Sequence, residues 1–139
     1  MQDVMVSIKG IQHNGRDSDC IEYLTVGKYG YRNGRSCIVY DDSASLGIEG
    51  VTTTLQIDRS NKVILQRSGS LQSRLIIERG QRNLCPYDMA VGSALLGVFG
   101  ETIVNDLTPN GGQFYMTYTL DLNNSLLSKN ELEISIKEV

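Results

Sequence analysis

The sequence predicts an all-β protein, a closed antiparallel up-and-down β-barrel of about eight to ten strands. Three observations predict this class. Val, Ile and Thr supply 30 of the 139 residues and Ala supplies three, and β-branched side chains favour strands over helices. Apolar and polar residues alternate with a period of two in many short segments, whereas no segment has helical periodicity over three turns. Turn signals rich in Gly and Asn separate these segments, and a two-sheet sandwich is the second architecture that fits them.

The N-terminal part of the chain contains six predicted strands. They are expected at residues 4–9, 20–32, 36–41, 52–57, 63–68 and 74–79. Asn14-Gly15 and Asn33-Gly34 predict tight turns, because both residue types tolerate positive φ. Gly27 interrupts the long second strand and predicts a bulge or a bend, as barrels need at their corners. Residues 41–50 are rich in Asp, Ser and Gly and predict a loop.

The pattern is less regular towards the C-terminus. Residues 80–92 have no clear periodicity and are expected to be a connection or an edge, and the place of an opening. Residues 94–104 are apolar on both faces, so this strand is expected to be covered on both faces or to bend at Gly97 and Gly100. Strands are then expected at 114–122 and 131–137, joined by a polar connection at 123–130. Closure of the sheet would remove its exposed edges.

Length, charge and cysteine usage limit the classes of protein. Residues 1–139 are expected to form a single domain, since domains cluster around ~100–150 residues. The formal net charge of −3 predicts no general attraction to nucleic acid or to an anionic membrane. Three cysteines without a CxxC pair and one histidine predict free thiols, no metal and no cofactor. Cys20 and Cys37 are expected to be small buried hydrophobes. With no signal peptide or apolar span, we expect a cytoplasmic protein.

Several short motifs occur in the order found in YwiB-like bacterial proteins, and they cover essentially the whole chain. They include Tyr40-Asp41-Asp42-Ser43, Thr52-Thr53-Thr54, Arg67-Ser68-Gly69, Glu78-Arg79-Gly80, Leu96-Gly97-Val98-Phe99 and Tyr118-Thr119-Leu120-Asp121-Leu122. The sequence therefore resembles this family. The resemblance implies a calycin-like, lipocalin-resembling β-barrel, and it implies no activity, because the family has no established substrate or catalytic residue. Residues 87–92 depart from the family pattern, since they lack its Thr-Pro pair.

Arg67 is the most informative candidate for a binding residue. It continues the face of Val63 and Leu65, so parity directs it towards the barrel interior, where a guanidinium needs a partner or a wet cavity. It could receive the carboxylate or phosphate of a ligand. Tyr118 could add a phenolic donor, and Arg67, Tyr118 and Tyr40 are the candidate ligand-binding residues. The alternative is a structural role, in which Arg67 leaves at the barrel rim or pairs with a carboxylate such as Glu22 or Glu101.

Other constellations are weaker. Tyr29 and Tyr31, with Lys28 and Arg32 nearby, are the best patch for nucleic acid, but cross-strand tyrosines are ordinary in sheets. Two further pairs are considered for chemistry, Cys85 with His13 as a thiol and imidazole, and Asp41 with Asp42 as a weak cation site. We predict a binder of a small amphipathic or acidic ligand held in the barrel. The alternative is a structural or protein-interaction module, or homodimer, that uses the outer face of residues 94–104. Enzymatic activity ranks third.

Overall fold

The computed structural model describes residues 1–43, 49–89 and 92–139. Within these residues, ten strands form a closed antiparallel barrel in which each strand pairs with its neighbours in sequence, and β1 pairs with β10. The strands are β1 (Gln2–Asn14), β2 (Asp17–Arg32), β3 (Arg35–Asp41), β4 (Val51–Ile57), β5 (Val63–Gly69), β6 (Ser73–Ile77), β7 (Arg82–Met89), β8 (Gly92–Thr108), β9 (Gly111–Leu122) and β10 (Ser125–Glu138). The predicted all-β up-and-down barrel is confirmed.

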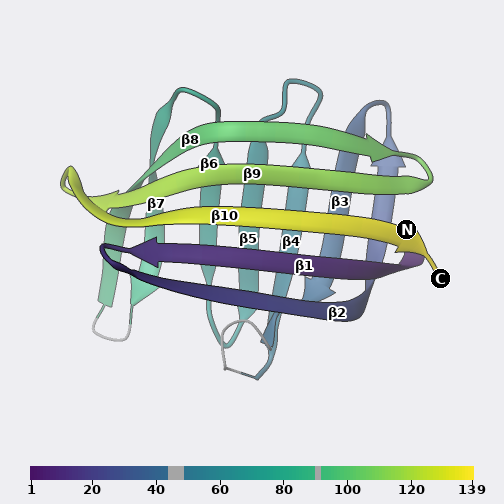
Figure 1. The fold of residues 1–139 in the computed structure, drawn as a ribbon, viewed down its shortest axis with the longest axis horizontal. Helices are drawn as coiled ribbons and strands as arrows, with labels where there is room; N and C mark the ends of the chain where they lie inside the picture. Colours follow the sequence, from purple (N-terminus) through teal and green to yellow (C-terminus); the bar gives the residue numbers. More distant parts are fainter. Residues whose placement is uncertain (44–48, 90–91) are drawn as a thin grey trace.

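The barrel is flattened into two layers. Strands β1, β8, β9 and β10 and most of β2 cross the front of the view in Figure 1, while β3–β7 run steeply across them behind. Two long strands join the layers at the corners. β2 pairs with β1 from Asp17 to Tyr29 and with β3 from Gly27 to Arg32. β8 likewise pairs first with β7 and then with β9.

A glycine lies at each corner. A Cβ atom on Gly27 would be 2.5 Å from the Val39 carbonyl oxygen and 2.9 Å from Val6 Cγ2. On β8, a Cβ atom on Gly100 would collide with the Glu78 carbonyl, and the register shifts beside it. Only a residue without a side chain lets the two layers approach this closely. The predicted bend at Gly27 therefore has a steric reason.

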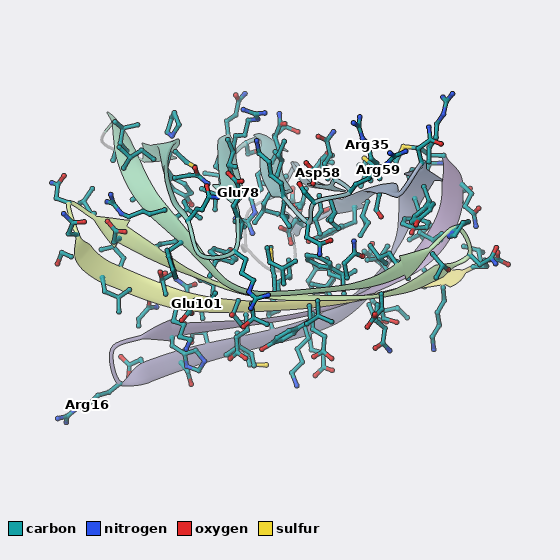
Figure 2. The ribbon with its side chains drawn as sticks, turned by 90° about the horizontal axis from the view of Figure 1, so that it is seen from above. Arg16, Arg35, Asp58, Arg59, Glu78 and Glu101 are labelled. Atoms are coloured by element: carbon teal, nitrogen blue, oxygen red, sulfur yellow. The ribbon has the colours of Figure 1, made fainter. Side chains whose placement is uncertain are left out.

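Side chains of alternate residues fill the space between the layers (Figure 2). The burial follows the predicted parity, since inward residues are nearly inaccessible and their neighbours are exposed. The largest fully buried side chains are Val4, Val6, Ile38, Val51, Leu55, Ile57, Leu65, Leu75, Ile77, Phe114, Met116 and Ile134. This apolar core holds the two layers together, because its burial removes a large hydrocarbon surface from water.

Two segments predicted to be connections are strands. Arg82–Met89 forms β7, which pairs with β8 over eight positions and with β6 at the single pair Ser73 and Tyr87. The region predicted as polar connection at 123–130 is a turn followed by β10, which begins at Ser125. In that part of β10 the outer side chains Leu126 and Leu127 are exposed. Alternation is lost there because the β9–β10 hairpin extends past the packed core.

The strand predicted at residues 94–104 is longer, and one of its faces is open. Leu96 and Val98 are buried, whereas Leu95 and Phe99 are exposed on the outer face. Of the two expectations, the bend at Gly100 is observed, and cover on both faces is not. Of the predicted loop at 41–50, residues 44–48 lie outside the described residues. The described part of the chain contains no helix with the length and apolar character to cross a membrane.

Candidate functional site

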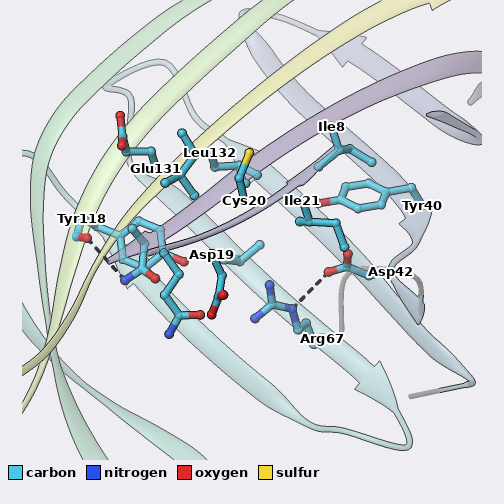
Figure 3. A pocket seen from close by; sticks show the side chains of 15 residues that line it. Ile8, Asp19, Cys20, Ile21, Tyr40, Asp42, Arg67, Tyr118, Glu131 and Leu132 are labelled. Carbon is cyan, nitrogen blue, oxygen red and sulfur yellow. Dashed lines mark hydrogen bonds and ion pairs between the residues drawn. The ribbon is translucent and has the colours of Figure 1, made fainter. Parts of the chain in front are cut away.

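A cavity of about 410 Å³ opens at the corner where β2 crosses between the layers. β3 begins to pair with β2 only at Gly27, so residues 17–26 of β2 have β1 as their one strand partner within the described residues. The gap lies between this free edge and the ends of β3 and β5, and β1, β9 and β10 complete the wall (Figure 3). The opening expected at residues 80–92 is therefore found at the β2 corner instead. A smaller cavity does lie along Leu84–Pro86.

One continuous row of polar side chains crosses the rear layer beside this cavity. Tyr40 pairs with Thr53, Thr53 with Arg67, Arg67 with Ser73, and Ser73 with Tyr87. Directly opposed residues in an antiparallel sheet point to the same face, so the five side chains share the inner face of β3–β7. The Ser73 hydroxyl is buried and has no hydrogen-bond partner among the described residues. The cross-strand register therefore gathers five inward polar groups.

The three candidate ligand-binding residues all line the cavity. Arg67 comes from β5, on the same face as Leu65 as parity predicts, and 19% of its side chain is exposed. Tyr40 comes from β3 and Tyr118 from β9 in the opposite layer. The structure thus brings together residues that are up to 78 positions apart in sequence. Their role in binding a ligand stays a prediction.

Asp42 has a role that the sequence does not predict, because the sequence suggests it only with Asp41 as a weak cation site, whereas in the structure it is the ion-pair partner of Arg67. Its carboxylate, 3% exposed, accepts hydrogen bonds from Arg67 Nε at 3.2 Å and Thr53 Oγ1 at 2.6 Å on Oδ2, and from the Tyr23 hydroxyl at 2.5 Å on Oδ1. The partner of Arg67 is therefore Asp42, and the suggested partners Glu22 and Glu101 were wrong. A signal existed, because Asp42 continues the inward parity of β3 one residue past the end of the strand.

The electrostatics keep the tyrosines neutral and Arg67 charged. Burial raises the pKa of Tyr40 well above its ordinary value, and the negative charge of Asp42 adds to this. Burial also raises the pKa of Tyr118, although the positive charge of Arg67 opposes it. For Arg67, burial acts to lower the pKa, but Tyr118, Asp42 and Tyr40 outweigh it, so the pKa is raised. Both phenols are therefore hydrogen-bond donors at neutral pH.

The cavity has donors without partners and an apolar wall. Among the described residues, the one hydrogen bond of the Arg67 guanidinium is made by Nε, and the hydroxyls of Tyr40 and Tyr118 have no partner. In Figure 3 the terminal nitrogens of Arg67 point away from Asp42, towards Asp19. The apolar part of the lining consists of Ile8, Ile11, Ile21, Leu65 and Leu132. The arrangement can receive a hydrogen-bond acceptor attached to a small hydrocarbon body.

The structure does not bring together the other residue pairs considered from the sequence, Cys85 with His13 and Asp41 with Asp42. His13 Nε2 lies 2.9 Å from Glu131 Oε2 on the outer surface, whereas the buried Cys85 has its sulfur near the Ile76 amide. Asp41 is exposed and accepts a hydrogen bond from the Ser43 amide, so it does not converge with the buried Asp42. No group of three His, Cys, Asp or Glu side chains suited to a metal ion occurs in the described residues.

The surroundings of one tyrosine and two cysteines bear on the remaining interpretations of the sequence. Tyr29 is buried and donates a hydrogen bond to the Thr108 carbonyl at 2.7 Å, so its ring is not available to stack on a base. Cys20 was expected to be buried but is exposed at the mouth of the cavity. It lies on the part of β2 that precedes the packed corner, where an apolar sequence run does not guarantee cover. Cys37 is half-buried.

The fold and the cavity define a class of protein, a closed antiparallel barrel with an apolar core and a polar cavity at a corner. Residues 6–134 match the family described as Domain of unknown function (DUF1934), and the chain belongs to this family. Among solved structures the chain is similar to the YwiB protein from Bacillus subtilis, with a TM-score of 0.81 and 17% identity, over 99% of this chain and 92% of that chain. The resemblance to YwiB-like proteins is confirmed. No curated protein matches the sequence.

Proposed function

We propose that this protein binds a small amphipathic molecule in the cavity at the β2 corner. The polar head of the ligand would accept hydrogen bonds from Arg67, Tyr40 and Tyr118, and its hydrocarbon part would lie against the isoleucine and leucine side chains. One observation carries the proposal: the hydroxyls of Tyr40 and Tyr118 and the terminal N–H groups of Arg67, which have no hydrogen-bond partner among the described residues, come from three strands and line the same cavity. Its volume of about 410 Å³ is in the range of small-molecule sites.

The charge balance narrows the class of ligand. The positive charge of Arg67 is paired with the buried Asp42, and the carboxylates of Asp19 and Glu131 add two further negative charges to the lining. A head with several negative charges would meet little net attraction there. A neutral acceptor or a single carboxylate fits better, because Arg67 can offer its terminal N–H groups without giving up Asp42.

Native mass spectrometry of the protein purified from its own host tests the proposal. We expect a retained small molecule on the wild type. Tyr118→Phe removes one hydrogen bond to the ligand and should weaken the affinity roughly tenfold, so that less ligand is retained. The hydroxyl has no partner among the described residues, so the variant should fold normally. Arg74→Met, on the outer face of β6, is the control and should retain the ligand. Bare protein in every preparation would contradict the proposal.

A second candidate function uses the outer surface of β7 and β8. Leu84 and Leu95 are 59% and 55% exposed, Phe99 is 37% exposed, and the three lie on adjacent paired strands. Exposed apolar side chains that gather on one face are typical of interaction surfaces. The same mass spectrum tests this candidate, since it predicts the mass of a dimer or of a complex with a partner. A monomer with retained ligand would favour the first function alone.

A further inference from the structure

A basic groove of about 1090 Å³ lies at another end of the barrel, outside the cavity described above. It runs between the β2–β3 turn and the β4–β5 turn. Of the described residues that line it, four are cationic, Arg32, Arg35, Arg59 and Lys62, and one is acidic, Asp58. Figure 2 shows Arg35, Asp58 and Arg59 on the same side of the molecule. A protein of net charge −3 thus concentrates four of its 13 cationic residues in one groove.

The acidic residue in the groove is used by the backbone. Asp58 Oδ1 accepts hydrogen bonds from the Ser60 amide at 2.9 Å, the Ser60 hydroxyl at 2.7 Å and the Lys62 amide at 3.0 Å. These bonds form the turn between β4 and β5. Within the described residues, none of the four cationic side chains forms an ion pair within 4.0 Å. Four cationic side chains against one carboxylate leave the groove with a net positive charge, although Lys62 acts electrostatically on Asp58 and contributes to lowering its pKa.

The positions of Arg32 and Arg35 lower the stability of the sheet. Arg32 and Arg35 are directly opposed across the β2–β3 ladder and close the turn at Asn33 and Gly34. The turn itself needs only the positive φ of Asn33 and Gly34, which are 54° and 76°. Like charges in directly opposed positions destabilise a sheet. The side chain of Arg59 reaches the same turn, where it donates to the Asn33 carbonyl and adds a third positive charge.

We propose that this basic groove binds an anion that contains a chain of two or more phosphate groups. Several guanidinium groups suit such a chain, because each presents a planar fork of donors to phosphate oxygens. A multiply charged ligand would also relieve the repulsion among the four cations. The chain of phosphates is common to inorganic tripolyphosphate and to nucleoside triphosphates. Nucleic acid is less favoured, because Tyr29 is buried, which leaves the half-buried Tyr31 as the one aromatic side chain among the described residues that line the groove.

Calorimetric titration tests the groove with tripolyphosphate, ATP and orthophosphate at about 50 mM salt, where screening is weak. We expect tripolyphosphate to bind and orthophosphate to bind at least about tenfold more weakly, since it spans fewer donors. Equal affinities for ATP and tripolyphosphate would identify the phosphate chain alone as the ligand. Tighter binding of ATP would identify a nucleotide as the source of that chain.

A matched pair of double variants distinguishes binding in the groove from general electrostatic attraction to the protein. Arg32→Gln with Arg35→Gln should weaken tripolyphosphate binding at least about tenfold, and its melting temperature should be equal or higher because the opposed charges are gone. Arg16→Gln with Arg74→Gln removes the same charge from exposed positions that do not line the groove and should leave binding unchanged. The proposal is overturned by absence of binding to the wild type, by equal losses in both double variants, or by tighter binding of a single-stranded RNA oligonucleotide than of tripolyphosphate.

Discussion

Replacement of Asp42 by alanine would remove the acceptor of three hydrogen bonds in the interior. Arg67 would lose its ion-pair partner, and the buried Thr53 hydroxyl would lose the bond of 2.6 Å that satisfies it. Removal of one partner of a buried ion pair costs about 3–5 kcal/mol. Because 19% of the Arg67 side chain remains accessible through the cavity, we expect the lower part of that range, about 3 kcal/mol of unfolding free energy.

Urea denaturation at pH 7, followed by far-ultraviolet circular dichroism, measures this loss. Asp106→Ala is the control, since Asp106 is exposed and such changes usually stay within about 0.5 kcal/mol. The double variant Asp42→Ala with Arg67→Met removes both charges and should recover at least about 1 kcal/mol relative to Asp42→Ala. A loss below about 1 kcal/mol in Asp42→Ala, or no recovery in the double variant, would refute the assignment of a buried, coupled pair.

Two further predictions concern the corner and the buried phenol. Gly27→Ala should lower the unfolding free energy by about 1–3 kcal/mol through overpacking. Gly10→Ala is the control and should be nearly neutral in thermal melts, because its new Cβ would lie 3.5 Å from its nearest neighbour. Equal effects of the two substitutions would contradict the steric account. Because burial raises the pKa of Tyr40 above 10.0, stability due to its neutral form is complete below about pH 10 and is lost as pH rises through the folded pKa. Tyr40→Phe should therefore flatten the alkaline fall in stability measured by urea titration, and an unchanged slope would argue against a buried neutral phenol.

The local pattern was sufficient where a strand packs on the core. Alternation placed Val63, Leu65 and Arg67 on one face, and the structure has them so. It was insufficient at strand ends. The sequence predicts connections at β7 and at the first part of β10, where the structure has strands. β7 is weakly paired with β6, and the first part of β10 belongs to a hairpin that extends beyond the core. In these two segments, apolar and polar residues do not alternate in the sequence, so no strand is predicted from it.

For the site, parity indicated that Arg67 points inward, and it could not indicate what Arg67 meets. Asp42 is its partner because the ladders of β3, β4 and β5 set Tyr40, Thr53 and Arg67 in one row. Such a row depends on the pairing of three strands with one another, and the alternation within one strand does not encode it.

The sequence by itself determined the strand content, the closed meander and the inward direction of most side chains, because these follow from a local period of two and from turn residues. The tertiary structure alone decided which corner stays open and which carboxylate faces Arg67. The open corner depends on where β2 leaves β1 to pair with β3, and the close approach of the two layers at Gly27 sets that point. The pairing of Arg67 with Asp42 depends on the ladders that join β3, β4 and β5.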